Sequence, residues 1–160
     1  MKIGAYPGTF DPITYGHIDI VKRALKIFGK LYILVSVNPS KKTLFTEDER
    51  IALIEHALAD CLDRVEIVTS HDLTVEHASK IGATHIVRGL RALTDFEYEF
   101  QMTHANRVLD KGIDSIFFMT DNKYSFLSST SIKEIAQFNG DLSTFAPPMI
   151  AKALKDKYGH

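Results

Sequence analysis

Residues 8–17 read Gly-Thr-Phe-Asp-Pro-Ile-Thr-Tyr-Gly-His and combine residue types that suit a phosphate-binding loop. Gly8 and Gly16 allow a backbone to approach a ligand closely, and Thr9 supplies a hydroxyl. His17 lies in the first turn of an expected helix, where free backbone N–H groups attract anions and an imidazole can hydrogen-bond a phosphate oxygen. A lone histidine is more often structural, but this loop favours a functional one. The stretch therefore predicts a site for the phosphates of a nucleotide.

Three cations further along the chain suit the same chemistry. Lys41, Arg88 and Arg91 fall in expected loops or beside the ends of expected strands, and such side chains bind phosphates. For Lys41, a solvated loop charge is an equally good interpretation. Lys42 is expected at the surface.

Hydroxyl groups crowd residues 128–131, Ser-Ser-Thr-Ser, at the expected start of a helix. Ser128 or Ser129 can cap this helix, and its free N–H groups suit phosphate groups. The sequence excludes two familiar phosphate motifs, since no G-x-G-x-x-G follows the first apolar run and no G-x-x-x-x-G-K-[ST] occurs. It also holds no recognisable Ser-His-Asp or Cys-His arrangement, which suits a reaction whose substrate brings its own nucleophile.

The elements that must position these residues alternate between strands and helices. Short runs that are apolar almost throughout, as in strands covered on both faces, occupy residues 2–6, 31–37, 64–69, 84–89 and 114–120. Helical patterns lie between and after these runs. The first carries Ile18, Val21, Leu25 and Phe28 and ends at Gly29. The second begins after Thr46, with Glu49 completing a capping box, and the others cover residues 73–81, 94–110, 129–138 and 147–157.

This alternation predicts an α/β fold: a single Rossmann-like domain over residues 1–160, with a doubly wound, five-stranded parallel sheet. Ligands of such sheets bind beyond the carboxyl ends of the strands, where the strand order reverses. With the order 3-2-1-4-5, the segments that follow the first and fourth strands meet at that point. Those segments contain Thr9 and His17, and Arg88 and Arg91.

Composition narrows the classes of partner. A formal net charge of −1, from 19 basic and 20 acidic residues, indicates neither nucleic acid nor a membrane surface as a partner, and no 18 apolar residues run together. Cys61 is the single cysteine, which excludes an internal disulfide framework. With too short an apolar run for a signal peptide near Met1, these features predict a cytoplasmic protein. The histidines and carboxylates lack metal-ligand spacing, so no protein metal site is predicted; Asp11 and Asp95 are expected to brace their loops.

The segment "GTFDPITYGH" resembles the Thr/His-x-Gly-His signature of the nucleotidylyltransferase superfamily, in its phosphopantetheine adenylyltransferase form. "NPSKKTLFTEDER", "RGLRALTDFEYEFQMTHANR" and "YSFLSSTSIKEIA" are similar to that family's other blocks and occur in the same order, so the resemblance spans nearly the whole chain. It implies transfer of the adenylyl group of ATP to 4′-phosphopantetheine, with Mg²⁺, to give dephospho-coenzyme A and pyrophosphate. Two alternatives stay open: a nucleotidylyltransferase acting on nicotinamide mononucleotide or a cytidylyl acceptor, and a nucleotide-binding module without chemistry.

The resemblance also implies roles for particular residues. His17, Lys41 and Arg91 would be catalytic, with His17 on the phosphate under attack. The pantetheine substrate would be held by Thr9, Lys41, Thr74, through its main chain, and Arg88. ATP would be held by Thr9, Phe10, His17, Gly89, Leu90, Arg91, Glu99, Tyr124, Ser125, Phe126, Leu127, Ser128, Ser129 and Thr130. Lys133 stands where the family more often has an arginine, which leaves it the charge without the bidentate fork.

The expected helix 94–110 carries two apolar stripes on roughly opposite faces. One contains Phe96 and Phe100, and the other contains Tyr98, Met102 and Leu109 together with Ala105. One face can pack on the sheet, and the other needs a partner, which predicts a homo-oligomer. The resemblance implies a hexamer, and implies that coenzyme A can bind as a feedback inhibitor.

Overall fold

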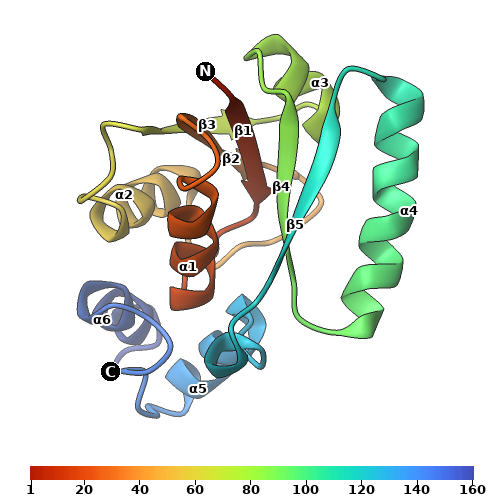
Figure 1. Cartoon of the computed structure of the whole chain (residues 1–160). Helices are drawn as coiled ribbons and strands as arrows, with labels where there is room; N and C mark the ends of the chain where they lie inside the picture. Colours follow the sequence, from red (N-terminus) through yellow and green to blue (C-terminus); the bar gives the residue numbers. More distant parts are fainter.

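The computed structural model contains one parallel sheet (Figure 1). Its strands are β1 (Ile3–Gly8), β2 (Lys30–Ser36), β3 (Val65–Ser70), β4 (His85–Leu90) and β5 (Asp114–Met119). The structure describes the backbone throughout and the side chains of residues 1–92 and 95–160. The order β3-β2-β1-β4-β5 confirms the predicted order 3-2-1-4-5, and each expected strand overlaps an observed one.

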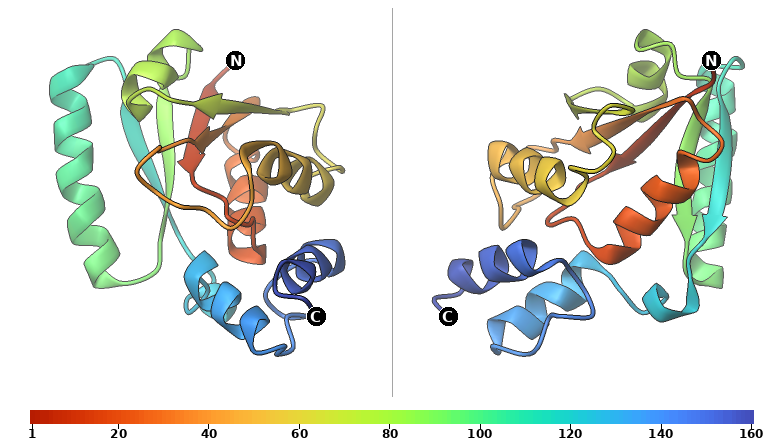
Figure 2. Two further views of the ribbon diagram at one scale, coloured as in Figure 1. Left: turned by 180° about the vertical axis from the view of Figure 1, so that it is seen from behind. Right: turned by 60° about the vertical axis from the view of Figure 1, so that its left-hand side comes forward.

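Helices cover both faces of the sheet and its carboxyl edge (Figures 1 and 2). They are α1 (Tyr15–Ala24), α2 (Glu47–Ala57), α3 (Thr74–Lys80), α4 (Leu93–Leu109), α5 (Ser129–Gln137) and α6 (Pro148–Lys157), with a 3-10 turn η1 (Asn122–Tyr124). α1 and α2 lie on one face, α3 and α4 on the other, and α5 and α6 below the strands in Figure 1. Among the described residues, none of these helices has the length and apolar character needed to cross a bilayer.

The core lies on both faces of the sheet, and β2 shows why. Its residues alternate between two clusters of buried side chains: Leu31 and Ile33 pack in the cluster beneath α1 and α2, while Leu34 packs with Val75 and Ala78 of α3. A strand buried on both faces needs apolar residues at consecutive positions. This requirement produces the apolar runs from which the strands were predicted.

The predicted N-cap of α2 is confirmed, but the predicted end of the first helix is wrong. Thr46 caps α2 in a capping box with Glu49. The expected helix ending at Gly29 stops at Ala24, although Leu25 and Phe28 are buried as predicted. The N–H groups of Lys26 and Ile27 donate to carbonyl oxygens three residues earlier, so the chain tightens into turns while still delivering Phe28 to the core.

The helix α4 packs differently from the prediction that one of its apolar stripes faces the sheet. Phe96 and Phe100 are exposed by 46% and 52%, and Tyr98 and Met102 by 59% and 40%. Among the described side chains of α4, the buried one is Glu99, which pairs with an arginine of β4. Both apolar stripes therefore face outward, and the helix meets the sheet with a polar side.

Candidate active site at the carboxyl edge of the sheet

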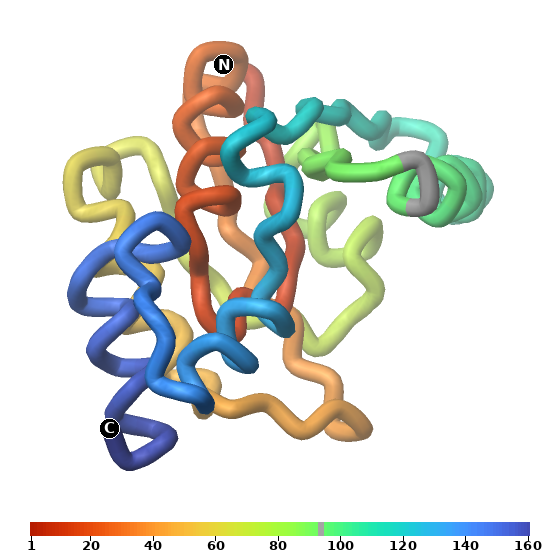
Figure 3. The backbone as a smooth tube through the Cα atoms, turned by 90° about the horizontal axis from the view of Figure 1, so that it is seen from below, coloured from red at the N-terminus to blue at the C-terminus, as the bar shows by residue number. Residues whose placement is uncertain are grey.

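β1 and β4 are adjacent strands that separate toward their carboxyl ends. They pair at Gly4 with His85 and at Ala5 with Ile86, whereas β1 pairs with β2 along its whole length. The strand order reverses at this point, so the separation leaves space where ligands of such sheets bind. Figure 3 views this edge from below, with the loop 37–46 in orange and α5 in blue on the same side.

Two cavities adjoin at this edge, and we call them the first and second chambers. The first, about 490 Å³, is lined by the loop after β1, the start of α1 and the segment 127–130. The second, about 560 Å³, is lined by the loop after β2 together with α2 and Thr74. Thr9, Lys41 and Arg88 line both chambers. Chemistry between a ligand in each chamber would take place beside these three residues.

The structure brings most of the predicted site residues to these walls. The first chamber is lined by Thr9, Phe10, His17, Lys41, Arg88, Gly89, Arg91, Tyr124, Leu127, Ser128, Ser129 and Thr130. The second chamber is lined by all four predicted pantetheine residues, Thr9, Lys41, Thr74 and Arg88. Leu90, Glu99, Ser125 and Phe126 do not line either chamber.

The loop that follows β1 is held in a strained conformation. Phe10 has a φ of +49°, in the left-handed region that costs a non-glycine residue about 1–2 kcal/mol, and its ring is buried. A Cβ on Gly8 would lie 2.9 Å from that ring, so Gly8 is needed where the Phe10 ring folds back over the strand. Burial of the ring offsets the strain and fixes the backbone from which Thr9 projects.

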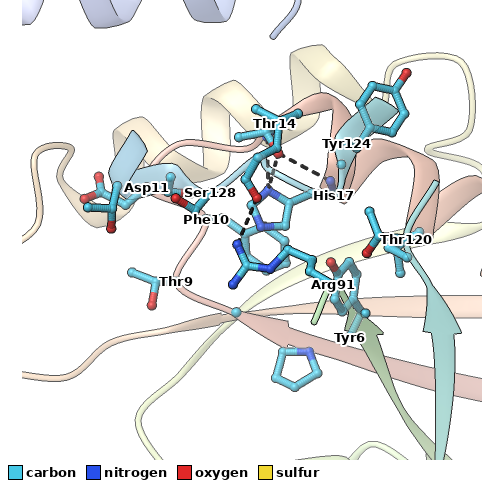
Figure 4. A pocket seen from close by; sticks show the side chains of 18 of the residues that line it. Tyr6, Thr9, Phe10, Asp11, Thr14, His17, Arg91, Thr120, Tyr124 and Ser128 are labelled. Atoms are coloured by element: carbon cyan, nitrogen blue, oxygen red, sulfur yellow. Dashed lines mark hydrogen bonds between the residues drawn. The ribbon is translucent and has the colours of Figure 1, made fainter. Parts of the chain in front are cut away.

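His17 is the third residue of α1 and is held by the residue that caps the helix. The N–H of Thr14 donates to Nδ1 of His17 at 3.0 Å, and the Thr14 hydroxyl accepts from the N–H of His17. An Nδ1 that accepts leaves the ring proton on Nε2. Figure 4 shows the ring between Thr14 and Arg91, with its free side toward the first chamber. His17 therefore offers an N–H donor to a ligand there.

The surroundings of His17 keep it neutral. Burial, followed by the charges of Arg91 and Arg88, lowers the pKa of His17 to about 4. The ring of Phe10 packs against it with centroids 4.9 Å apart, so an apolar surface replaces water on one side. At neutral pH His17 is a hydrogen-bond donor rather than a general base.

Arg91 connects the start of α4 with the segment before α5. Its Nη1 donates to the carbonyl oxygen of Leu127 at 2.8 Å, and its Nε contacts Asp95 at 3.1 Å. Ser128 caps α5 in a capping box with Ser131, and the Ser129 hydroxyl donates to the carbonyl oxygen of Pro12. These bonds fix the N-terminus of α5 beside the loop that follows β1. Its backbone N–H groups and Arg91 thus face one anion-binding space.

Arg88 is held rigidly by Glu99. Its Nε and Nη2 donate to the two carboxylate oxygens at 2.6–3.0 Å, and its Nη1 donates to the carbonyl oxygen of Pro7 at 3.2 Å. Glu99 is buried, and a bidentate pair of this kind fixes the plane of the guanidinium. The structure therefore places Glu99 where it orients Arg88, and its predicted contact with ATP stays a prediction.

Asp11 ties the loop that carries Lys41 to the rest of the site. Its carboxylate accepts from the N–H groups of Leu44 and Phe45, both at 2.9 Å, and from Nζ of Lys133 at 3.0 Å. The predicted role of Asp11 as a brace is confirmed by these bonds. Lys133 lines the first chamber with its ammonium engaged by Asp11.

Several chamber residues were missed from the sequence. Thr120 follows β5 directly and lines the first chamber, so its place at the end of an expected strand was a usable signal. Lys42 also lines the first chamber, although it is exposed as expected. Arg50 lines the second chamber from within α2, where helical periodicity gave no sign of a site. Among the described residues, no three His, Cys, Asp or Glu side chains gather to hold a metal ion.

Comparison with known proteins gives three findings. The sequence matches the cytidylyltransferase-like family over residues 5–135. Two proteins named phosphopantetheine adenylyltransferase, from Lachnoclostridium phytofermentans and Caldanaerobacter subterraneus subsp. tengcongensis, are 49% and 48% identical over 158 residues, which is 99% of this chain and 96% and 98% of theirs. A solved structure from Vibrio parahaemolyticus, provisionally described as a nicotinate-nucleotide adenylyltransferase, aligns with a TM-score of 0.75 at 19% identity, over 99% of this chain and 96% of that one. The last likeness concerns the fold alone.

Proposed function

Because the chain belongs to the phosphopantetheine adenylyltransferase family, we propose that it transfers the adenylyl group of ATP to 4′-phosphopantetheine, forming dephospho-coenzyme A and pyrophosphate. The observation that carries the proposal is the meeting of two chambers at Thr9, Lys41 and Arg88. Two anionic substrates need separate spaces that open onto one reacting centre. A nucleotide-binding module without chemistry needs one chamber.

ATP is assigned to the first chamber and the acceptor to the second. The first chamber combines Arg91, the N-terminus of α5 and the donor on His17, which together suit a triphosphate. The second chamber extends away from this centre along Thr74 and Tyr98, which gives a long substrate room for its uncharged arm. Lys41 and Arg88 lie where its phosphate end would approach ATP.

The reaction is an in-line substitution at the α-phosphorus of ATP. An oxygen of the 4′-phosphate forms a bond to this phosphorus while the bond to the oxygen that bridges the α and β phosphates breaks, and that electron pair leaves with pyrophosphate. Lys41 and Arg88 orient the attacking phosphate, and Nε2–H of His17 donates to an oxygen of the α-phosphate as charge grows there. Arg91 and α5 receive the charge of the leaving group.

We propose that Mg²⁺ accompanies ATP. Mg²⁺ is usually held by substrate phosphates, water and one or two carboxylates, and the first chamber offers the hydroxyls of Thr9 and Thr120 rather than a carboxylate cluster. Asp11 lines this chamber as well, but its carboxylate is engaged by two N–H groups and Lys133. When bound, the ion would neutralise part of the triphosphate charge.

Release of pyrophosphate tests the proposal. The protein is assayed with ATP and Mg²⁺ and one acceptor at a time: 4′-phosphopantetheine, nicotinamide mononucleotide or glycerol phosphate. We expect release that depends on 4′-phosphopantetheine. Release with one of the other two acceptors alone would assign a different nucleotidylyltransferase activity, and binding of ATP without release would favour a binding module.

The exposed apolar residues of α4 support a homo-oligomer, with the hexamer implied by the family as the proposed state. Phe96, Tyr98, Phe100 and Met102 are all exposed by 40% or more on a single helix, and exposed patches of this kind usually mark an interface. Light scattering at micromolar concentration should give a mass several times that of the chain, and a monomer would contradict the proposal.

Two further proposals concern regulation and location. Feedback binding of coenzyme A across both chambers is proposed from the family resemblance. A cytoplasmic location is proposed from the sequence.

A further inference from the structure

Arg50 lies in the wall of the second chamber and crosses the ends of two strands. It belongs to α2, and 3% of the residue is exposed. Its Nη1 donates to the carbonyl oxygen of Thr9 at 2.8 Å and to that of Ser36 at 3.0 Å. Figure 2 (left) shows how the loop from β2 to α2 passes over this edge. The guanidinium therefore lies beneath the chamber to which the acceptor is assigned.

The charge of Arg50 has no partner of opposite sign among the described side chains. The other arginines of the site are paired, Arg88 with Glu99 and Arg91 with Asp95. No described carboxylate lies within ion-pairing distance of Arg50, and its Nε is buried without a hydrogen-bond partner. Glu47 lines the same chamber from the first turn of α2 but forms no ion pair with it. A buried cation is costly unless an anion compensates it.

We propose that Arg50 makes the second chamber select an acceptor that carries a phosphate. Glu99 already balances the charge of Arg88, and the other described charges that line this chamber are Lys41, Arg50 and Glu47, which leaves one positive charge in excess. Lys41 is exposed on a loop, whereas Arg50 is fixed under the chamber in a setting of lower polarity, where its field is screened less. The acceptor phosphate supplies the missing negative charge. This inference rests on the proposed function for the identity of the acceptor.

Binding of the acceptor with and without its phosphate tests the role of Arg50. Calorimetric titration measures Kd for 4′-phosphopantetheine, pantetheine and ATP in the wild type, Arg50→Gln and Arg50→Lys. We expect Arg50→Gln to raise Kd for 4′-phosphopantetheine by about tenfold or more, and Kd for pantetheine or ATP by less than about threefold. Arg50→Lys keeps the charge and should recover most of the loss, and it also serves if Arg50→Gln does not fold.

Arg64→Gln is the matched control. Arg64 also donates to backbone carbonyl oxygens, those of Leu25, Phe28 and Gly29, but at the amino-terminal edge of the sheet, away from both chambers. The variant Arg64→Gln should lower the melting temperature of the protein without changing its preference for the phosphorylated acceptor. Equal losses for 4′-phosphopantetheine and pantetheine in Arg50→Gln, or an unchanged preference, would overturn the inference and leave the proposed function standing. A wild type that does not bind 4′-phosphopantetheine would overturn both.

Discussion

Substitution of His17 can separate its donor toward the first chamber from its bond to Thr14. Nδ1 accepts the Thr14 N–H at 3.0 Å, so Nε2, on the other side of the ring, carries the proton. His17→Asn places an amide oxygen near the position of Nδ1 and no donor at that of Nε2. His17→Gln reaches the position of Nε2 with an amide N–H and leaves Thr14 without its acceptor. The two variants therefore remove one function each.

The size of the effect follows from the charge that the donor meets. Negative charge grows on the oxygens of the α-phosphorus as the fifth oxygen bonds, and loss of one fixed donor to such an oxygen costs about 10²–10³ in kcat. We expect His17→Asn to lose that much kcat, with a change of less than about threefold in either KM. His17→Gln should recover about tenfold of this loss. Pyrophosphate release at saturating substrates gives kcat, and the titration of each substrate gives its KM.

A purely structural histidine would give the opposite pattern. His17→Asn would then keep kcat within about fivefold of the wild type, because the bond to Thr14 survives. His17→Gln would lose about 0.5–1.5 kcal/mol of stability with that bond, and its activity would fall only as the folded fraction falls. This pattern of kcat and melting temperature would refute the transition-state role.

The lowered pKa of His17 adds a test by pH. Burial, then Arg91 and Arg88, set the pKa to about 4 in the folded chain, against an ordinary value of about 6.5 when unfolded. Between about pH 4 and pH 6.5, His17 is mostly protonated in the unfolded chain and neutral in the folded chain. Stability is therefore lost as the pH falls from about 6.5 to about 4, by at most about 3 kcal/mol. His17→Asn lacks this proton, so its melting temperature should fall less over this range. Identical profiles would contradict the assignment.

Two further predictions concern the loop 37–46. Lys41→Ala should raise KM for 4′-phosphopantetheine about tenfold and KM for ATP less. Lys42 lines the first chamber but not the second, so Lys42→Ala should leave KM for the acceptor nearly unchanged. Equal losses of acceptor binding in the two variants, measured by calorimetry, would contradict this prediction. Asp11→Asn should destabilise the protein by about 1–3 kcal/mol, because an amide cannot accept both loop N–H groups and pair with Lys133. Its melting temperature should fall and both KM values should rise, and a rise for one substrate alone would show that the loop keeps its place.

The parts of the fold that could be predicted are those fixed by neighbours in the sequence. A strand covered on both faces needs consecutive apolar residues, so β2 could be recognised from its own residues. The capping box of Thr46 with Glu49 spans three residues, and so does that of Ser128 with Ser131. The strand order has no such local signal: it was predicted as an order that would bring together the segments after the first and fourth strands, and the structure confirms it.

The contacts that shape the site join residues far apart in the sequence, and their partners were not predicted, even for Asp11, which was expected to brace its loop. Arg50 donates to Thr9, 41 residues away, and Asp11 accepts from Leu44, 33 residues away. Arg50 and Asp11 are charged, and a charged side chain in a helix or loop is normally expected at the surface. Their burial depends on backbone groups that the strands bring to the sheet edge, and sequence spacing holds no signal of those groups.

In α4, the ion pair with Arg88 decides which side of the helix faces the sheet, and the apolar pattern of the helix does not. Its stripes predicted an apolar side against the sheet, since burying Phe96 and Phe100 would be favourable. Arg88 on β4 is mostly buried and needs a carboxylate, and removing the partner of a buried charge costs about 3–5 kcal/mol. Glu99 supplies this carboxylate only when the polar side of α4 faces the sheet. The aromatic residues are then left outside, where another copy of the chain can cover them, so the requirement that fixes Arg88 also creates the surface proposed for assembly.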